Sequence, residues 1–461
     1  MNETDPVVPA LRYRWKGYFD PIERHMYFPY SFTVPKTALA IHATIRYGGV
    51  GNHLGLSLYE SDNLRAHGRT FVTEDWVELK AVVSANDNVP GSAPGPIPAG
   101  SWQAEISTNQ LNQRCPFELV IEIWPGRTPP QKSPLPPPRV EKMNDSPGWY
   151  RGDLHAHSVD SDGTATAEEL FAAAAQQGLH FLALTDHNNL FNRWKLPRKT
   201  HGVLPLSAIE ITTFHGHANA FGVYDWVDWR TGRNGRTIND IADEVHRLGG
   251  LFSVNHPRAP NSPDGHASWS HKDFDWSKAD AMEIWNAPVF SGGEEANRQC
   301  RALWDSLLNR GLRITGLGGS DVHHLDGNRQ PLGLPVNYLY LTELSTKGIL
   351  QAIRLGRVFV TRGPEIYLRA SSELGYTLPG ETVISGHIEF TVQVRCRGTR
   401  ALTLRVIGNG ELLREVPVTR DHFIYRFGAV GAPGEWFRVE LMQQRAGEER
   451  LVAFANPVFV G

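Results

Sequence analysis

The chain has 461 residues, 41% of them hydrophobic and 21% charged, with a net charge of −3. This length exceeds one ordinary hydrophobic core, so two or three domains are expected. The near-neutral charge gives no reason to expect nucleic acid or a membrane surface as partner, except a small nucleotide as substrate. No apolar run approaches the roughly 18 residues needed to span a bilayer. Residues 1–5 lack the basic start of a signal peptide, which favours a cytoplasmic location.

Residues 1–128 are typical of a β-rich N-terminal domain. Short alternating segments are separated by Gly, Pro and Asn clusters; they are Ala38–Tyr47, His53–Tyr59, Trp76–Val83 and Phe117–Trp124. Residues 129–148 form a proline-rich linker that includes Pro136-Pro137-Pro138, a composition that favours extended polyproline geometry. The three cysteines (Cys115, Cys300 and Cys396) show no metal or redox spacing, so reduced thiols are expected.

In residues 149–366 the pattern changes to strands alternating with helices. Thr166 and Glu169 form a capping box that opens a helix, and the buried strand Phe181–Leu184 follows it. A second helix is predicted at Ile238–Leu248 and a third at Gln299–Asn309. This alternation predicts an α/β fold, a parallel barrel or sheet with crossover helices, whose chemistry gathers at the C-terminal ends of the strands. Residues 367–461 alternate like antiparallel strands and predict a small β-sandwich.

Candidate metal ligands, all imidazole or carboxylate, are spread through this central region. They are His155, His157, Asp162, His187, Glu210, His217, His256, Asp321 and His323. Such donors suit Zn²⁺, Mn²⁺ and Fe²⁺. Nine side chains are too many for one ion and enough for two or three. The pattern therefore predicts a multi-metal hydrolytic centre.

The sharpest motif begins at Asp153. His155 and His157 stand two residues apart, so in a strand they point to one face and grip one ion. Asp153 is expected to accept the spare N–H of a ligand histidine. Asp162 lies past a turn, within reach of a neighbouring ion. The alternative, two surface histidines in a loop, is disfavoured by the capped helix and the Thr185-Asp-His187 strand end that follow.

Glu210 lies inside the apolar strand Leu206–Ile211, where a carboxylate needs a partner or a metal because burying it alone is costly. Its two oxygens could bridge two ions. His217 follows seven residues later, and His215 is a candidate that composition does not separate from it. Each of these residues on its own could be a satisfied core side chain.

The last motif follows Gly318-Gly319, two small residues that let backbones approach closely. Asp321 and His323 share a face. His324 points the other way and is a candidate acid, a substrate contact or a loop histidine.

Taken in order, these motifs resemble the PHP family, named for polymerase and histidinol phosphatase. The resemblance implies a distorted barrel of seven βα units with a two- or three-metal site. By position, one ion would take His155, His157, Glu210 and Asp321. A second would share Glu210 and add His217 and His256, and a third would take Asp162, His187 and His323. The flanking β-rich regions, with the Arg357–Pro364 stretch, look like the CehA/McbA-type metallohydrolases, a group named for carbaryl hydrolases that cleave a carbamate ester.

The resemblance implies a metal-dependent hydrolase, and we expect a phosphoesterase in which a hydroxide bridging two ions attacks the substrate. The ions would be Mn, Zn or Fe. Glu210 and Asp321 are the expected catalytic carboxylates, and His324 is the candidate acid. Arg258 and Arg362 are candidates for binding a phosphorylated small molecule.

Two other hypotheses stay open at this point. The flanks favour a carboxyl- or carbamate-ester hydrolase, and nitrophenyl phosphate esters against nitrophenyl acetate would separate it from a phosphoesterase. A metal-stabilised binding protein without catalysis is the third hypothesis, which tight metal binding without turnover would support. The sequence leaves a homo-oligomer open.

Overall fold

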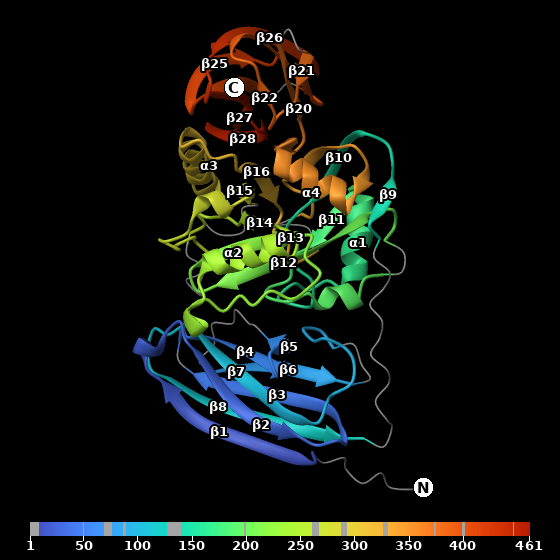
Figure 1. The fold of residues 1–461 in the computed structure, drawn as a ribbon, viewed down its shortest axis with the longest axis vertical. Helices are drawn as coiled ribbons and strands as arrows, with labels where there is room; N and C mark the ends of the chain where they lie inside the picture. The colour runs from blue at the N-terminus through green and yellow to red at the C-terminus, as the bar shows by residue number, and fades with distance from the viewer. Residues whose placement is uncertain are drawn as a thin grey trace.

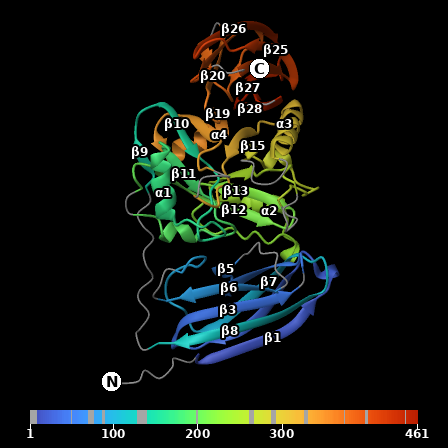
Figure 2. The same cartoon turned by 180° about the vertical axis from the view of Figure 1, so that it is seen from behind.

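The computed structural model describes residues 9–48, 50–68, 76–85, 89–126, 140–197, 200–260, 267–286, 293–325, 331–372, 375–398, 402–445 and 447–461. Three regions follow one another along the longest axis: N-terminal sheets at one end, a central α/β region, and C-terminal strands at the other end (Figures 1 and 2). The prediction of a mixed α/β fold is confirmed, with many strands and few helices.

The N-terminal region consists of two four-stranded sheets, ordered β1-β8-β3-β6 and β2-β7-β4-β5. Its strands are β1 (Leu11–Phe19), β2 (Tyr27–Val34), β3 (Ala38–Gly48), β4 (His53–Glu60), β5 (Asn63–Gly68), β6 (Trp76–Ser84), β7 (Gly100–Gln110) and β8 (Cys115–Pro125). In β8, Leu119 and Ile121 are fully buried, whereas Glu118 and Glu122 point outward. This alternation is the one that the sequence predicts for a half-buried strand.

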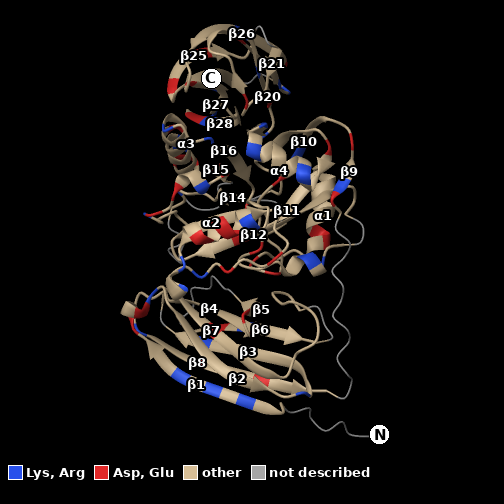
Figure 3. Ribbon diagram, viewed as in Figure 1, with Lys and Arg blue, Asp and Glu red and all other residues tan. Residues whose placement is uncertain are grey.

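Strand β1 forms one edge of its sheet and carries the row of basic residues visible in Figure 3. Arg12 pairs with Glu122, and Arg14 and Lys16 pair with Glu118 on β8. Charged side chains on an edge strand discourage pairing with another chain. The basic row therefore protects a sheet edge and is largely neutralised by its neighbours.

The second N-terminal sheet packs on the central region. Tyr59 and Leu64 belong to the same buried apolar cluster as the central strands. The side chain of Arg230 lies between the two regions, donates to Glu105 of β7 at 3.1 Å, and stacks over the Tyr59 ring. A shared core and a buried ion pair make the two regions one packed body.

The central region holds all four α-helices of the described residues. Its elements are β9 (Lys142–Asn144), β10 (Gly148–Asp153), α1 (Ala167–Gln176), β11 (Phe181–Leu184), β12 (Leu204–Thr213), β13 (Gly216–Phe221), α2 (Ile238–Arg247), β14 (Leu251–Val254), β15 (Ala281–Asn286), α3 (Gly293–Asn309), β16 (Thr315–Gly319), β17 (Val336–Leu341), β18 (Leu344–Ser345), α4 (Thr346–Leu355) and β19 (Val358–Thr361). Four short 3₁₀ turns lie at Pro21–Glu23, Phe191–Trp194, Arg233–Gly235 and Trp276–Lys278.

The helices begin where side chains satisfy their free N–H groups. The predicted capping box is present on α1: Thr166 Oγ1 accepts from the Glu169 N–H at 3.3 Å, and the Glu169 carboxylate accepts from the Thr166 N–H at 2.8 Å. Thr237 and Asp240 form an equivalent box on α2. Helix α3 begins at Gly293, earlier than the predicted Gln299.

The central strands form an extended sheet in the order β16-β15-β14-β13-β12-β11-β10-β17-β19. β10, β11 and β12 are parallel, as are β14, β15 and β16, but β13 runs antiparallel between the two groups. The expectation of uniform βα units is therefore wrong at β13, which follows β12 through a tight turn without a crossover helix.

The described residues show no closed barrel, contrary to the expected seven-unit barrel. Beyond β16, the Asp321 N–H donates to the His155 carbonyl at 2.9 Å, and the His157 N–H donates to the Val322 carbonyl at 2.9 Å. Those contacts amount to a single isolated bridge rather than a strand ladder. They nevertheless bring the ends of β10 and β16 together, which is what the site requires.

The C-terminal region consists of strands. They are β20 (Glu365–Ser372), β21 (Gly375–Thr377), β22 (Thr382–Val383), β23 (Gly386–Arg395), β24 (Leu402–Gly408), β25 (Glu411–Pro417), β26 (His422–Gly431), β27 (Trp436–Arg445), β28 (Glu448–Ala455) and β29 (Val458–Val460). One sheet has the order β21-β20-β23-β26, and the other continues the central sheet because β28 pairs with β19. The predicted sandwich is therefore not seen as a separate body.

Asn456 makes a further link to the central region. Its amide side chain accepts from the Gly316 N–H at 2.7 Å and donates to the Gly316 carbonyl at 2.8 Å. The C-terminal segment thereby supports β16, the strand that leads to Asp321.

Most of the predicted proline-rich linker, up to residue 139, lies outside the described residues. Its last part is built into the fold, because β9 pairs with β18. Among the described helices, none combines the length and hydropathy that a membrane crossing requires.

Candidate metal centre

The nine predicted ligands come from six separate segments. His155, His157 and Asp162 follow β10, and His187 follows β11. Glu210 lies in β12 and His217 in β13. The remaining residues, His256, Asp321 and His323, follow β14 and β16. Most of them therefore stand at strand ends, as the alternation of strands and helices predicts.

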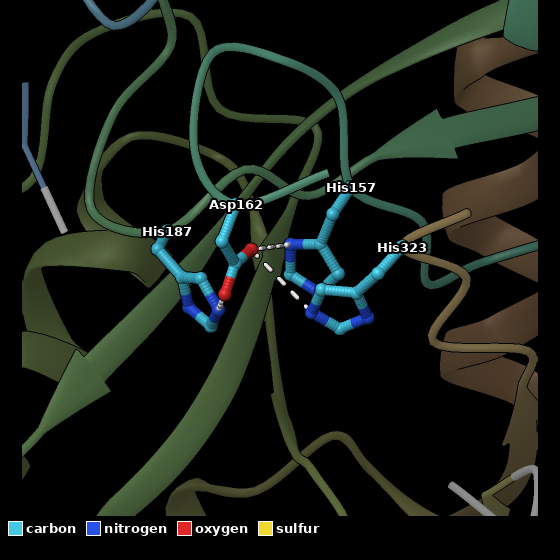
Figure 4. A group of neighbouring side chains, drawn as sticks. All are labelled: His157, Asp162, His187 and His323. Carbon is cyan, nitrogen blue, oxygen red and sulfur yellow. Dashed lines mark ion pairs between the residues drawn. The ribbon is translucent and has the colours of Figure 1, made fainter. Parts of the chain in front are cut away.

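The structure brings all nine side chains into four overlapping groups, in each of which the potential ligand atoms lie within 4.8 Å of one another. The groups are His157, Asp162, His187 and His323; His155, His157 and Asp321; His155, Glu210 and His256; and His187, Glu210 and His217. Figure 4 shows the first group, with Asp162 between His187 on one side and His157 and His323 on the other.

Glu210 stands at the centre of the cluster, and its two oxygens face different histidines. Oε1 lies 3.2 Å from His217 Nδ1 and 3.3 Å from His155 Nε2. Oε2 lies 2.9 Å from His187 Nδ1 and 3.5 Å from His157 Nε2. A carboxylate placed in this way is able to serve two ions at once.

Two histidines of the cluster are oriented by backbone carbonyls. His256 Nδ1–H donates to the Ala267 carbonyl at 3.1 Å, and His323 Nδ1–H donates to the Asp321 carbonyl at 2.8 Å. A carbonyl only accepts, so in the neutral imidazole the proton is on Nδ1 and the lone pair is on Nε2, which faces the cluster. Metal-binding histidines are usually held in this manner.

Glu283 on β15 is a member of the site that the sequence predictions missed. Its Oε1 accepts from His155 Nδ1 at 2.7 Å, and its Oε2 accepts from the His256 N–H at 3.0 Å. The signal was the one used for Glu210, a carboxylate inside an apolar strand. Asn255 was also missed; it donates to Glu210 Oε1 at 2.8 Å.

The prediction for Asp153 is wrong. This carboxylate accepts backbone N–H groups of His155 at 3.2 Å, Ser320 at 3.2 Å and Gly333 at 2.7 Å. It is fully buried and organises loops, whereas Glu283 takes the expected place beside His155. The sequence spacing brought Asp153 near the histidine but did not reveal that three N–H groups converge on it.

The surroundings of β16 agree with the prediction that its glycines allow a close approach of neighbouring groups. A Cβ on Gly319 would lie 2.2 Å from Glu283 Oε1 and 2.7 Å from His155 Cβ. Just beyond, Asp321 has a φ of 52°, and His256 on the neighbouring loop has a φ of 27°. Left-handed backbone is uncommon for such residues and is often found at functional sites.

The charges of the cluster depend strongly on one another. Burial opposes the charged form of Glu210, yet His155, His187 and His217 hold its pKa well below the ordinary value. Burial also opposes the charge of His323, but Asp162 raises its pKa to about 9. In the metal-free protein, protons on His155 and His323 therefore compensate the buried carboxylates, whereas burial lowers the pKa of His157 and that of His217, the latter to about 4.

Within the cluster, three buried atoms form no hydrogen bond with the described residues, and each could face a cation. They are Asp162 Oδ2, Glu210 Oε2 and His217 Nε2. In addition, His155 Nε2 and His157 Nε2 lie 3.2 Å apart. Two nitrogens about 2.1 Å from one tetrahedral ion would be separated by about 3.4 Å. The donor set therefore fits divalent metal ions.

The other predicted site residues do not join the cluster. His324 is exposed and contacts Thr164 Oγ1 at 3.1 Å. Arg258 is exposed, and Arg362 lies 3.7 Å from Glu294 and over the Trp285 ring.

The sequence left open whether His215 or His217 is the ligand, and the structure distinguishes the two. His215 lies outside the described groups, with its ring beside those of His25 and His271.

One family model matches the segment that carries six of the nine donors. Residues 153–233 match the model of the PHP domain. Over 68 residues the chain is 40% identical to an error-prone DNA polymerase of Symbiobacterium thermophilum. That match covers 14% of this chain and 6% of the polymerase, so it spans a small part of the curated relative.

Among solved structures, the chain is similar to a two-domain protein of Bacteroides vulgatus described as containing a PHP-like metal-dependent phosphoesterase. The identity is 16%, the TM-score is 0.39, and the match covers 70% of this chain and 99% of the other. A candidate metal-dependent phosphoesterase of Bifidobacterium adolescentis is 18% identical with a TM-score of 0.31, covering 44% of this chain and 95% of the other.

Proposed function

We propose that the protein is a metal-dependent hydrolase that cleaves phosphate esters of small molecules at a two- or three-metal site. The observation that carries the proposal is the convergence of nine imidazole and carboxylate donors, from six segments, into overlapping groups whose ligand atoms lie within 4.8 Å of one another. The PHP domain match at residues 153–233 supports the same reading.

In this proposal the donors divide among three ions, two of which share Glu210, as the family resemblance implies. The first would be held by His155, His157, Glu210 and Asp321, the second by Glu210, His217 and His256, and the third by Asp162, His187 and His323. When bound, divalent ions such as Mn, Zn or Fe would lower the pKa of water to about 7 and neutralise charge on the attacked oxygen.

The chain itself contributes orientation and proton placement. Glu283 fixes the ring of His155, and the Ala267 carbonyl fixes that of His256, so both present Nε2 to the cluster. Asn255 holds Glu210 Oε1 by an N–H donation and thereby sets how the central carboxylate is turned. The nine donors are almost entirely buried, which keeps bulk water from competing for them.

A direct test is to measure metal content and turnover of the same purified protein. Mass spectrometry would count bound ions, and nitrophenyl phosphate, bis-nitrophenyl phosphate and nitrophenyl acetate would be offered with added Mn²⁺. We expect two or three ions per chain and faster turnover of a phosphate ester. Bound ions without hydrolysis of any ester would refute the proposed function and favour a non-catalytic binding protein.

A second candidate is hydrolysis of a carboxyl or carbamate ester. The ion pairs described for the nine donors all join histidine to carboxylate, while Arg258 is exposed and Arg362 lies beside Glu294. A neutral carbonyl substrate needs no arginine beside the ions. Preference for nitrophenyl acetate in the same experiment would favour this candidate.

A further inference from the structure

The loop that carries Asp162 is held from outside the central region. The Gly91 N–H of the N-terminal region donates to Asp160 Oδ1 at 2.9 Å. Lys195 donates to the same Asp160 oxygen and also to the Val89 carbonyl, the latter at 2.7 Å. The ammonium of Lys195 therefore ties the Asp162 loop to the N-terminal backbone.

The N-terminal side of this contact is anchored to a strand. The His67 N–H of β5 donates to the Gly91 carbonyl at 2.9 Å, and the Ala93 N–H donates to the Arg65 carbonyl at 2.9 Å. Gly91 has a φ of +69°, and a Cβ there would lie 2.8 Å from the His67 carbonyl oxygen. The segment that meets Asp160 is thus fixed to the N-terminal sheet.

The central region holds the same loop from the opposite side. Asp186 accepts from the Ser158 N–H at 2.7 Å and from Ser161 Oγ at 2.8 Å. Asn189 donates to the Asp160 carbonyl at 2.9 Å. The loop is therefore clamped between two regions of the chain, and the Asp160 side chain reaches the N-terminal one.

Burial makes the Lys195–Asp160 pair more than a surface ion pair. The Asp160 side chain is 2% exposed and that of Lys195 is 14% exposed. Removing one partner of such a pair leaves an uncompensated buried charge, which is strongly unfavourable. The loop would have to shift to hydrate Asp160, and Asp162 lies two residues away.

We propose that Lys195 and Asp160 are positioning residues through which the N-terminal domain sets the place of Asp162. The affinity of the ion held by Asp162, His187 and His323 then depends on a contact between two domains. This inference rests on the metal centre of the proposed function. It assigns the N-terminal domain a part in building the site.

The test compares Lys195→Met with Glu105→Gln in the full-length protein. Both variants break a buried ion pair at the boundary between the N-terminal and central regions. The Lys195–Asp160 pair lies in the central region and touches Val89 and Gly91 of the N-terminal one, whereas Glu105 pairs with Arg230, away from the Asp162 loop. Apoprotein would be titrated with Zn²⁺ or Mn²⁺ by calorimetry, with bound ions counted by mass spectrometry. We expect Lys195→Met to weaken one ion by roughly tenfold or more and the others by less than twofold. Lys195→Arg should restore binding, and Glu105→Gln should leave it unchanged.

Equal metal affinities of Lys195→Met and the wild-type protein would overturn the inference. A wild-type protein that binds no metal ion at His187 and His323 would overturn it as well. Asp160→Asn, which keeps the side-chain shape, serves if Lys195→Met does not fold, and unchanged affinity there counts equally against the inference. The metal readout is separate from turnover. Three bound ions without ester hydrolysis would refute the proposed function and leave this inference standing.

Discussion

Replacing Glu283 with glutamine tests the outer support of the metal centre. Glu283 Oε1 accepts from His155 Nδ1, and Oε2 accepts from the His256 N–H and from Asn286 Nδ2 at 3.1 Å. Glutamine has nearly the same shape but offers one acceptor oxygen, and its amide group would face a donor. One of the two histidine contacts is therefore lost in the variant.

The size of the effect follows from those contacts. A hydrogen bond to a charged group contributes about 1.5–3 kcal/mol. Losing one corresponds to about a 10- to 100-fold weaker metal affinity, the range found when such outer partners of metal ligands are changed. The histidine that loses its contact would be less well oriented. Because His155 and His256 both face Glu210, we expect weaker binding of the ions that share Glu210.

The measurement is a calorimetric titration of Zn²⁺ or Mn²⁺ into apoprotein, with turnover of nitrophenyl phosphate recorded alongside. Glu440→Gln is the matched control, because Glu440 is also buried and charge-paired, with Arg438, but lies in the C-terminal sheet. Metal affinity of Glu283→Gln within twofold of the wild type, or a loss equal to that of Glu440→Gln, would show that Glu283 does not support the ligands.

Four further outcomes are expected. His217→Ala should weaken metal binding by roughly a hundredfold or more while His215→Ala leaves it intact, and equal effects would contradict the assignment. Gly319→Ala should destabilise the fold by about 1–3 kcal/mol in urea and displace Glu283, whereas Gly148→Ala has room and should be neutral. Burial lowers the pKa of His271 to about 3, so the unfolded chain takes up the proton first and apoprotein should lose stability as pH falls below about 6.5. His271→Gln should flatten that loss in urea midpoints measured from pH 8 to 4. Saturating wild-type apoprotein with Mn²⁺ at a hundredfold excess over Kd should add about 2.7 kcal/mol of stability, seen as a higher Tm that a chelator reverses.

The local structure of the central region was predictable wherever short-range chemistry decides it. The Thr166–Glu169 box and the apolar runs at Phe181–Leu184 and Leu251–Val254 are local signals, and the structure has them. Strand direction and pairing depend on contacts far apart in sequence. Nothing in residues 216–221 tells whether β13 returns through a tight turn or a crossover helix, and nothing in Leu451–Phe454 identifies β19 as the partner of its strand.

The site was predictable from the order of its donors more than from any single residue. Each of His187, His217 and His256 could be a core histidine when taken alone. The residues that orient these histidines were harder to predict, because their role depends on which side chains and carbonyls come close to the histidines in the folded protein. Glu283 gave a usable signal as a carboxylate in an apolar strand, whereas the carbonyl of Ala267 gave none.

The contact between Asn456 and Gly316 bears on how the protein is made. The two residues lie 140 positions apart, and the amide of Asn456 bonds both the N–H and the carbonyl of Gly316 in β16. During translation, β16 leaves the ribosome long before Asn456 has been synthesised. The strand β16, which leads to Asp321, therefore reaches its final form only after residue 456 has emerged. Nascent chains stalled earlier would hold the candidate ligands without this support of β16.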